Sequence, residues 1–270
     1  MRAVITGSAG FIGSTLAERL VAEGWWVTGI DSFSPFYAAA DKEANLAALV
    51  GERRFDLVRA DVATMSLDRV LADRPLIVHL AAQPGVLGSF GTGFDQYLHD
   101  NLLATQRLFE AAAEAGCPRV VYASSSSVYG DAEAYPCYED ATPTRPRSPY
   151  GVTKRAGEKL AEVYAGMGLP TVGMRYFTVY GPRQRPDMAI RRLCEAATGG
   201  RVPVDRQAAQ IGDVWRTAGD TSRARACLGW RPRVSLRDGL RAELDWVRER
   251  REAEIALVPT DISLIAGRAS

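Results

Sequence analysis

The sequence lacks the usual signs of a polyanionic partner, an oxidising compartment or a membrane. Its 33 basic and 32 acidic residues leave a formal net charge of +1, which predicts neither nucleic acid nor an anionic membrane as a partner. The longest apolar runs are far shorter than a membrane span. There are only four cysteines and no CxxC pair, which argues against a zinc site and a disulfide framework. We expect a cytoplasmic protein without a metal, with reduced and mostly buried thiols at Cys117, Cys137, Cys194 and Cys227.

Lysine and histidine are scarce as well. The only lysines are Lys42, Lys154 and Lys159, so each deserves consideration as a functional residue. Of the two histidines, His79 ends an apolar run and is expected in the core, whereas His99 lies in a helical stretch and is expected at the surface. The first strand is expected to begin at residue 2, and we expect no signal peptide before it.

Short apolar runs alternate with amphipathic stretches through most of the 270 residues. This alternation predicts βαβ units, and hence a Rossmann-type α/β fold with a doubly wound parallel sheet. The expected strands are Arg2–Thr6, Trp26–Asp31, Phe55–Arg59, Leu76–His79, Arg119–Ala123 and Thr171–Arg175. The expected helices between them are Phe11–Glu23, Ala38–Val50, Leu67–Ala72, Phe94–Ala115 and Tyr150–Met167.

The rhythm changes after residue 175. Helices are expected at Asp187–Thr198, Thr221–Leu228 and Leu236–Arg251, with irregular segments between them. We therefore expect a nucleotide-binding domain at residues 1–175 and a small C-terminal lobe at 176–270. The lobe is too small and broken to fold independently, and we expect it over the carboxyl edge of the sheet, where open α/β folds bind ligands.

A glycine-rich turn follows the first strand directly and opens the first helix. Gly7 allows the tight turn, Gly10 lets the backbone approach a pyrophosphate, and Gly13 allows close packing of the helix. The helix N-terminus then presents N–H groups to the phosphates. Asp31 ends the second strand, where a carboxylate accepts hydrogen bonds from the adenosine ribose and repels a 2′-phosphate. This pattern predicts a dinucleotide site that prefers NAD to NADP.

Two further strand ends are candidates for the cofactor site. Asp61 and Val62, after the third strand, are expected either to contact the adenine or to begin the next helix. The segment Leu80-Ala81-Ala82 ends the fourth strand with small residues, which would let the backbone lie close to a cofactor.

A tyrosine and a lysine lie four residues apart on one helix, at Tyr150 and Lys154. A lysine ammonium near a phenol favours the phenolate, which can then take a proton from a sugar hydroxyl. One βα unit earlier, the run Ser124–Ser127 ends the fifth strand. A serine hydroxyl there could bond the substrate hydroxyl, although self-bonding in a turn would explain three of the four serines.

At this point the chain resembles the extended short-chain dehydrogenase/reductase family, in its nucleotide-sugar epimerase and dehydratase branch. The resemblance rests on TGSAGFIGS, Asp31, HLAAQ, SSSSVYG, YGVTK, RYFTVYGPRQRPDMA and GDVWRTAGDTSRARACLGWRP, in order along the chain. It implies a Ser/Thr–Tyr–Lys triad at Ser125, Tyr150 and Lys154, with Ser126 the nearest rival for the serine. The expected cofactor-binding set is Gly7, Gly10, Phe11, Ile12, Gly13, Asp31, Asp61, Val62, Leu80, Ala81, Ala82, Tyr150, Lys154 and Tyr176.

The resemblance narrows the reaction. Related 4,6-dehydratases carry acidic residues directly after the triad Ser/Thr, whereas Ser126 and Ser127 stand here, which favours simple 4-epimerisation of a UDP-sugar. The FTVYGP and RPDM segments look most like UDP-glucuronate 4-epimerases, and they imply that Thr178 and Arg185 contact the substrate carboxylate. The alternative is that Arg185 binds the diphosphate or lies in solvent. Leu87 departs from that pattern, because these epimerases usually have arginine there.

A second departure is a deletion. Several dozen residues of the family pattern are missing between Gly200 and Gln210, including an arginine that holds the nucleotide phosphates, while Asp213, implied to contact the nucleotide ribose, is present. The chain is then a reduced enzyme, or a segment is missing from the sequence. The alternatives to 4-epimerisation are another C4-oxidising reaction, such as decarboxylation or a specialised dehydration, and a non-catalytic NAD-binding protein. The resemblance also suggests a homodimer through the helices Phe94–Ala115 and Tyr150–Met167.

Overall fold

The computed structural model describes residues 1–199 and 211–256. By internal contacts the chain forms two compact units. The first comprises Met1–Val179 and Arg206–Arg231, and the second comprises Tyr180–Asp205 and Pro232–Ser270. The domain division expected at residue 175 stays a prediction.

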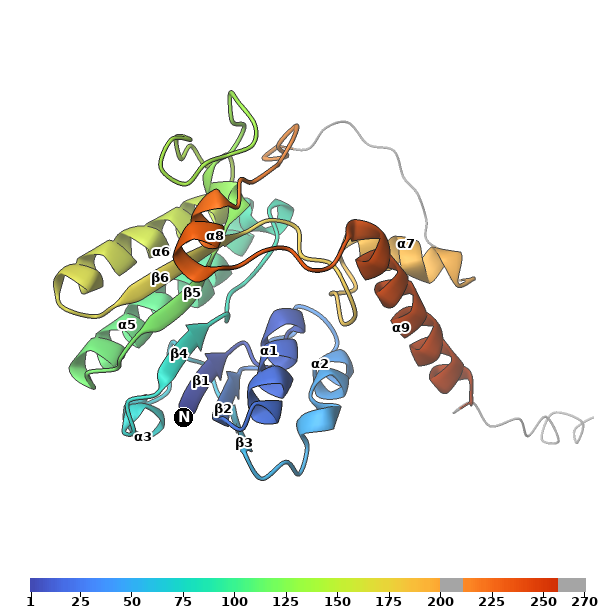
Figure 1. The fold of residues 1–270 in the computed structure, drawn as a ribbon, viewed down its shortest axis with the longest axis horizontal. Helices are drawn as coiled ribbons and strands as arrows, with labels where there is room; N and C mark the ends of the chain where they lie inside the picture. Colours follow the sequence, from blue (N-terminus) through green and yellow to red (C-terminus); the bar gives the residue numbers. More distant parts are fainter. Residues whose placement is uncertain (200–210, 257–270) are drawn as a thin grey trace, which may run out of the picture. The chain divides into compact units, whose positions relative to one another are not determined.

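The first unit is built on a six-stranded parallel sheet, with strand order β3-β2-β1-β4-β5-β6 (Figure 1). The predicted strands are therefore confirmed, and β5 and β6 continue one or two residues beyond the expected ends. The order reverses between β1 and β4, and such a switch point is where doubly wound folds bind ligands. The strands are β1 Arg2–Thr6, β2 Trp26–Asp31, β3 Phe55–Arg59, β4 Leu76–His79, β5 Val120–Ser125 and β6 Thr171–Tyr176.

Alternating strand residues supply a hydrophobic core on each face of the sheet. Val4 of β1 belongs to a cluster with Leu108 and Phe109, which lie on one helix that covers one face of the sheet. The next residue, Ile5, belongs to the cluster that includes Ala17, from the opposite face. Successive side chains of a strand point to opposite faces, so a continuous apolar run is needed when helices cover both.

Helices cover both faces of the sheet (Figure 1). On the first face lie α1 (Phe11–Ala22) and α2 (Ala39–Asn45). On the second face lie α3 (Asp68–Leu71), α5 (Ala104–Glu114) and α6 (Pro149–Gly166). The expected helix Ala38–Val50 ends early, because a separate 3-10 turn follows at Ala47–Leu49.

The expected helix Phe94–Ala115 is interrupted. It begins as α4 (Phe94–Tyr97), continues as a π-helix at Leu98–Leu103 and becomes α-helical again in α5. π turns are rare and occur inside α-helices, so the amphipathic pattern predicted one continuous helix. The remaining helices are α7 (Ala189–Ala197) and α9 (Leu236–Ala256) in the second unit and α8 (Ser222–Leu228) in the first.

The strands begin at the edge marked by the N-terminus in Figure 1, and the glycine turn follows β1 at the opposite edge.

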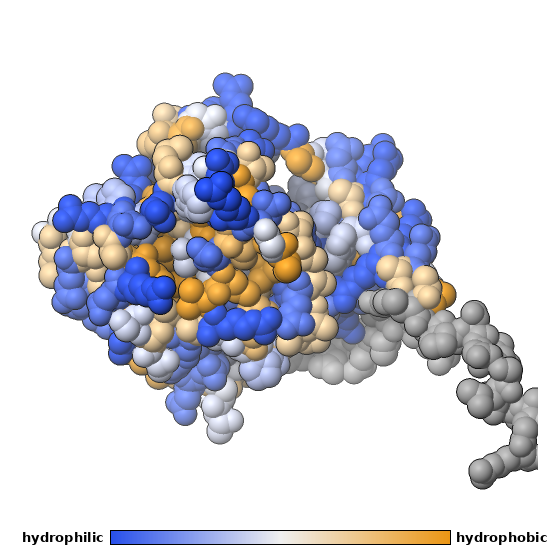
Figure 2. All heavy atoms as spheres, turned by 90° about the horizontal axis from the view of Figure 1, so that it is seen from below, coloured by the Kyte–Doolittle hydropathy of each residue, from blue (hydrophilic) through white to orange (hydrophobic). Residues whose placement is uncertain are grey.

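Seen from below, hydrophobic residues gather in the middle of the molecular surface with hydrophilic ones around them (Figure 2). Trp26, the first residue of β2, is 37% exposed, and the guanidinium groups of Arg2 and Arg53 lie 5.9 and 5.8 Å from its ring centroid. No described helix is both long enough and apolar enough to cross a bilayer.

Candidate functional site

The glycine turn is packed so tightly that side chains are excluded from it. Gly7 has φ +70°, and a Cβ there would lie 2.8 Å from the backbone nitrogen of Ala81. A Cβ on Gly13 would lie 2.1 Å from the carbonyl oxygen of Gly7. Gly10 is the N-cap of α1 and makes no side-chain capping bond. Because this 12-residue helix begins at the glycine turn, the positive end of its dipole points at the turn. The turn has the shape and charge that suit a bound pyrophosphate.

Asp31 is buried at the carboxyl end of β2 and is held by backbone donors. Its Oδ2 accepts from the N–H of Ala9 at 3.0 Å, and its Oδ1 accepts from the N–H of Phe33 at 2.8 Å. Lys42 of α2 places its Nζ 3.9 Å from Asp31 Oδ1. The carboxylate is therefore fixed beside the glycine turn, with a lysine that sequence reasoning noted but did not assign.

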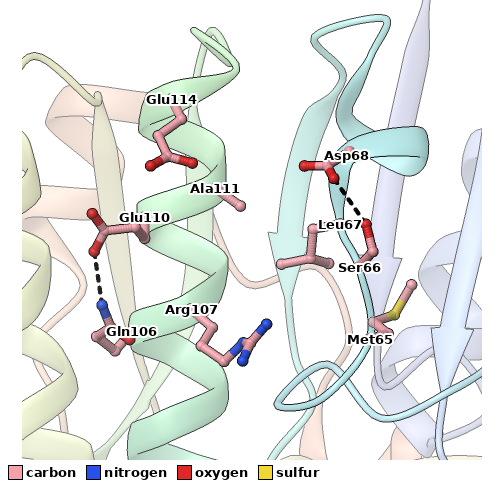
Figure 3. Close-up of a pocket in the computed structure, with 9 residues that line it drawn as sticks. All are labelled: Met65, Ser66, Leu67, Asp68, Gln106, Arg107, Glu110, Ala111 and Glu114. Carbon is pink, nitrogen blue, oxygen red and sulfur yellow. Dashed lines mark hydrogen bonds between the residues drawn. The ribbon is translucent and has the colours of Figure 1, made fainter.

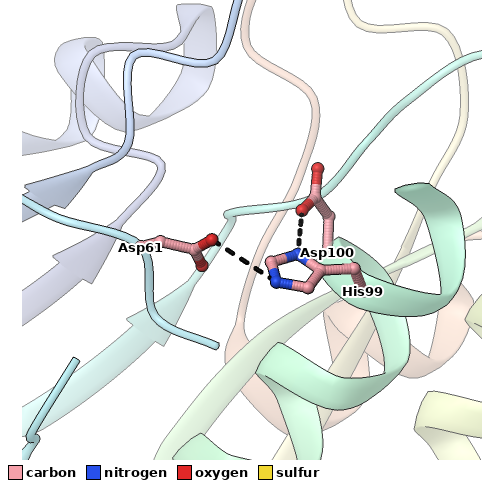
Figure 4. Close-up of side chains that lie close together, drawn as sticks. All are labelled: Asp61, His99 and Asp100. Atoms are coloured by element: carbon pink, nitrogen blue, oxygen red, sulfur yellow. Dashed lines mark hydrogen bonds and ion pairs between the residues drawn. The ribbon is translucent and has the colours of Figure 1, made fainter. Parts of the chain in front are cut away.

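Asp61 lies in a small cluster of charged side chains (Figure 4). Its Oδ1 accepts from the N–H of Ala63 at 2.8 Å, and its Oδ2 lies 3.6 Å from His99 Nε2. The other ring nitrogen of His99 bonds Asp100 at 2.8 Å. The His99 side chain is 35% exposed, so it lies at the surface as expected, with a carboxylate beside each ring nitrogen. Val62, next to Asp61, is buried.

The ligand atoms of Asp61, His99 and Asp100 lie within 4.8 Å of one another, a spacing that a cation could bridge. The hydrogen bond to Asp100 raises the pKa of His99, with burial opposing it, and so favours the imidazolium. In this structure the imidazole and the two carboxylates pair with one another.

His79 is a core residue, as expected. Its Nδ1 lies 2.7 Å from the Thr6 hydroxyl, and its Nε2 lies 3.0 Å from the Thr105 hydroxyl. Burial, reinforced by the nearby Lys154, lowers the pKa of His79 to about 3. The imidazole is therefore neutral at physiological pH and ties β4 to β1 and to α5.

Tyr150 and Lys154 lie at the start of α6. Ser148 caps this helix by accepting from the N–H of Gly151 at 3.0 Å, and the Tyr150 ring packs edge-on against Tyr97, with centroids 6.2 Å apart. Lys154 Nζ lies 6.0 Å from the centroid of the Tyr150 ring. Burial lowers the pKa of Lys154 to about 8, so the ammonium is still mostly charged at pH 7.

The serine run ends β5 directly beside this helix. Ser125 is the last strand residue, and its hydroxyl accepts from the N–H of Ser127 at 3.1 Å. A Cβ on Gly151 would lie 2.8 Å from the carbonyl oxygen of Ser127, so the serine turn and the start of α6 are in close contact. Ser124 points elsewhere and donates to Glu158 at 2.6 Å.

Sequence reasoning missed Asn101, in the π-helix. Its Oδ1 accepts from the N–H of Gln83 at 2.7 Å, and its Nδ2 donates to the carbonyl oxygen of Gln83 and to the Thr153 hydroxyl. The side chain thus joins the segment after β4 to α6, one residue before Lys154. An asparagine within an amphipathic helical stretch is the one signal that could have indicated it.

A buried ion-pair network behind the serine run was missed as well. Glu158 Oε1 accepts from Arg175 Nε at 2.8 Å, and its Oε2 accepts from another Arg175 nitrogen at 2.9 Å and from Arg155 at 2.6 Å. Arg175 also donates to the Tyr129 hydroxyl at 3.0 Å. The network joins α6, β6 and the turn after β5.

The other predicted cofactor residues lie at the same edge. Phe11 and Ile12 begin α1, and Leu80, Ala81 and Ala82 follow β4; all five are partly buried. Tyr176 ends β6, and burial raises the pKa of its phenol.

The predicted substrate residues are divided between the units. Thr178 is exposed near the end of the first unit's long segment, and Asp213 is exposed in its short one. In the second unit Arg185 makes a two-point ion pair with Asp187, at 2.9 and 3.0 Å. The deletion expected after Gly200 lies outside the described residues.

A pocket of about 340 Å³ lies apart from these residues, between α5 and the segment that leads into α3 (Figure 3). No predicted site residue lines it. Within it Ser66 bonds Asp68 at 3.0 Å and Gln106 bonds Glu110 at 2.8 Å, so these polar groups satisfy one another.

Known proteins resemble this chain over most of its length. The chain is 46% identical to the uncharacterized UDP-glucose epimerase YtcB of Bacillus subtilis over 195 residues, which are 72% of this chain and span 61% of that relative. It is 32% identical to the UDP-glucose 4-epimerase of Mycolicibacterium smegmatis, with 93% of this chain and 99% of the relative covered. That alignment runs over 319 positions, more than the 270 residues present here, so dozens of positions of the relative have no counterpart.

Comparison with solved structures also finds epimerases as similar proteins. The crystal structure of UDP-glucuronic acid 4-epimerase from Bacillus cereus, in complex with UDP-glucuronic acid and NAD, superposes with a TM-score of 0.86 at 32% identity. It covers 93% of this chain and 100% of the other. The model of the NAD dependent epimerase/dehydratase family matches residues 3–220. The chain belongs to the NAD dependent epimerase/dehydratase family.

Proposed function

We propose that the protein catalyses the NAD-dependent 4-epimerisation of a UDP-linked sugar of the UDP-glucuronate or UDP-glucose type. The observation that carries the proposal is the contact between the serine turn after β5 and the start of α6, which has Tyr150 and Lys154 four residues apart. The names of the relatives support the same reaction.

The residues at the sheet edge fit NAD. Gly7, Gly10 and Gly13 leave no side chain in the turn, and the N-terminus of α1 would hold the pyrophosphate. Asp31 would accept from the adenosine ribose, and Asp61 with Val62 would border the adenine. When bound, NAD supplies a reversible hydride acceptor for C4 of the sugar.

The chain's own residues would handle the proton. The phenolate of Tyr150 takes the proton from the O4 hydroxyl, and the ammonium of Lys154 stabilises the phenolate by its charge. Ser125 would hold O4 in both oxidation states, donating to the ketone oxygen of the intermediate. Return of the proton from Tyr150, after the ketone has turned over, completes inversion at C4.

The sugar is proposed from residues outside the triad. Ser126 and Ser127 offer no acid for eliminating water, which supports epimerisation over 4,6-dehydration. Arg185 has the planar, two-donor geometry that suits a hexuronate carboxylate, and its pairing with Asp187 shows that the guanidinium engages a carboxylate in this way. This geometry of Arg185 favours UDP-glucuronate.

The shortened C-terminal part supports a second candidate, a non-catalytic NAD-binding protein. The positions that the M. smegmatis enzyme has and this chain lacks are expected to include a phosphate-binding arginine. Loss of that residue would weaken nucleotide-sugar binding more than NAD binding, since the glycine turn and Asp31 belong to the first unit.

A homodimer through α5 and α6 is part of the proposal. The two helices are joined by Gln106, which donates to the Tyr164 hydroxyl at 2.9 Å. Large apolar side chains are exposed along this pair of helices and the adjoining π turn: Leu103 at 45%, Val152 at 51%, Val163 at 60% and Met167 at 65%. An apolar face of this kind is typical of a subunit interface.

Proton NMR of UDP-glucuronate incubated with the purified protein tests the proposal. We expect the signals of UDP-galacturonate, and no product with Tyr150→Phe. A UDP-pentose would assign decarboxylation instead. Absence of turnover on UDP-glucuronate and UDP-glucose, with NAD bound, would favour the non-catalytic protein.

A further inference from the structure

Lys42 is a buried lysine that the proposed chemistry leaves unused. It is 5% exposed, although lysine is almost never buried without a partner. Its Nζ donates to the carbonyl oxygen of Ser34 at 2.9 Å and to the hydroxyl of Ser34 at 3.3 Å, and the ammonium lies 4.9 Å from the centroid of the Tyr37 ring. Both hydrogen bonds are to neutral groups.

The side chain is directed at the carboxylate that is proposed to bind ribose. Nζ lies 3.9 Å from Oδ1 of Asp31, too far for a hydrogen bond and close enough for a bridging atom to reach both groups. An ammonium has three hydrogens, and the bonds to Ser34 use two of them. A hydroxyl between the two side chains could donate to Asp31 and accept from Lys42.

The helix that carries Lys42 is fixed to the phosphate-binding turn. Asn45, one turn along α2, is buried and donates to the carbonyl oxygen of Ala9 at 3.0 Å. Ala9 in turn donates its N–H to Asp31. Lys42, Asp31 and the glycine turn therefore form one assembly, in which the ammonium has a set position relative to the proposed pyrophosphate site.

We propose that Lys42 is a second adenosine-ribose residue, which donates to a ribose hydroxyl that Asp31 accepts from. The inference rests on the proposed NAD site but not on turnover. It explains the buried ammonium: burial lowers the pKa of Lys42, while the charges of Asp31 and Asp100 oppose that shift and favour the charged donor.

NAD binding by titration calorimetry, after removal of copurified cofactor, tests the proposal. We expect Lys42→Met to bind NAD about tenfold more weakly or worse, since a charge-assisted hydrogen bond is lost. The matched control is Lys159→Met, whose ammonium is exposed and pairs with Glu162; its affinity for NAD should be unchanged. Unchanged affinity in Lys42→Met would overturn the proposal, whereas failure of the wild type to bind NAD would overturn the proposed function itself.

Deoxyribose analogues separate contact with the ribose from a general loosening of the site. Wild-type protein should bind 2′-deoxy-NAD or 3′-deoxy-NAD, in the adenosine ribose, more weakly than NAD. In Lys42→Met that penalty should shrink, because one partner of the hydroxyl is already gone. An equal penalty in both proteins, or no penalty with either analogue in the wild type, would contradict a bond from Lys42 to the ribose.

Discussion

Lys154 donates from its ammonium group to the carbonyl oxygen of Ala123, with the two atoms 3.0 Å apart. This bond joins the start of α6 to β5 two residues before Ser125. It also fixes a positive charge in a buried place, where desolvation lowers the pKa of the lysine to about 8.

Replacing this charge should change how stability depends on pH. In the unfolded chain a lysine has a pKa of about 10.4, so between pH 8 and 10 the unfolded state binds more protons than the folded state. The cost of the buried charge is therefore fully present below pH 8 and is relieved as the pH rises. In chemical denaturation, the unfolding free energy of the wild type minus that of Lys154→Met should increase from pH 8 to 10. A constant difference over that range would contradict the assigned burial.

The two histidines should respond to pH in opposite senses. His79 has a pKa lowered to about 3, so its unfolded state binds more protons between pH 6.5 and 3, and stability is lost as the pH falls. The pKa of His99 is raised, mainly by Asp100, so its contribution is present below pH 6.5 and is lost as the pH rises through the folded pKa.

Urea unfolding of His79→Gln and His99→Gln from pH 4 to 8 checks this. The unfolding free energy of His79→Gln, relative to that of the wild type, should be higher at pH 4 than at pH 7. For His99→Gln the same difference should be lower at pH 4 than at pH 7. Parallel curves for the two variants would show that their environments are not as described.

The glycine turn should tolerate no side chain at Gly13. An added methyl would lie 2.1 Å from the carbonyl oxygen of Gly7, so Gly13→Ala must displace the turn. We expect a loss of several kcal/mol in stability, of the size that severe backbone clashes bring, together with weaker NAD binding. Gly157→Ala is the control, because nothing lies within 4 Å of its Cβ and alanine in a helix is worth about 0.5–1 kcal/mol over glycine. Equal melting temperatures for Gly13→Ala and Gly157→Ala would contradict the close packing of Gly13 against Gly7.

The network behind the serine run should be a large source of stability. Glu158→Gln leaves Arg175 without its charged partner, and breaking a buried pair in this way costs about 3–5 kcal/mol. Glu162→Gln, one turn further along α6 and 60% exposed, should cost less than about 1 kcal/mol. Guanidinium denaturation measures both; similar losses would mean that Glu158 is not buried as an ion pair.

The fold could be read from the sequence where local pattern and tertiary structure agree. The six strands follow from apolar runs, because helices on both faces require continuous burial. The glycine turn was also predictable, since Gly7 and Gly13 meet steric demands that few other residues satisfy.

Features set by contacts between distant segments were not predictable. An amphipathic pattern does not distinguish the rare π turn at Leu98–Leu103 from an α-helix, yet it is the segment from which Asn101 reaches Gln83 and Thr153. Likewise, Glu158 is an ordinary acidic residue of an amphipathic helix until β6 brings Arg175 beside it. Lys42 was notable only for rarity, and its place beside Asp31 depends on how α2 packs on the glycine turn.

If NAD removes and returns hydride at C4 of a UDP-sugar while the triad moves the O4 proton, an isotope at that carbon tests the proposed reaction most directly. UDP-glucuronate carrying deuterium at C4 would be incubated with the protein in ordinary water, and the product examined by NMR and mass spectrometry. The account predicts UDP-galacturonate that keeps its C4 deuterium, with no product from Tyr150→Phe. Product that has exchanged the C4 deuterium for solvent hydrogen, or full activity in Tyr150→Phe, would contradict it.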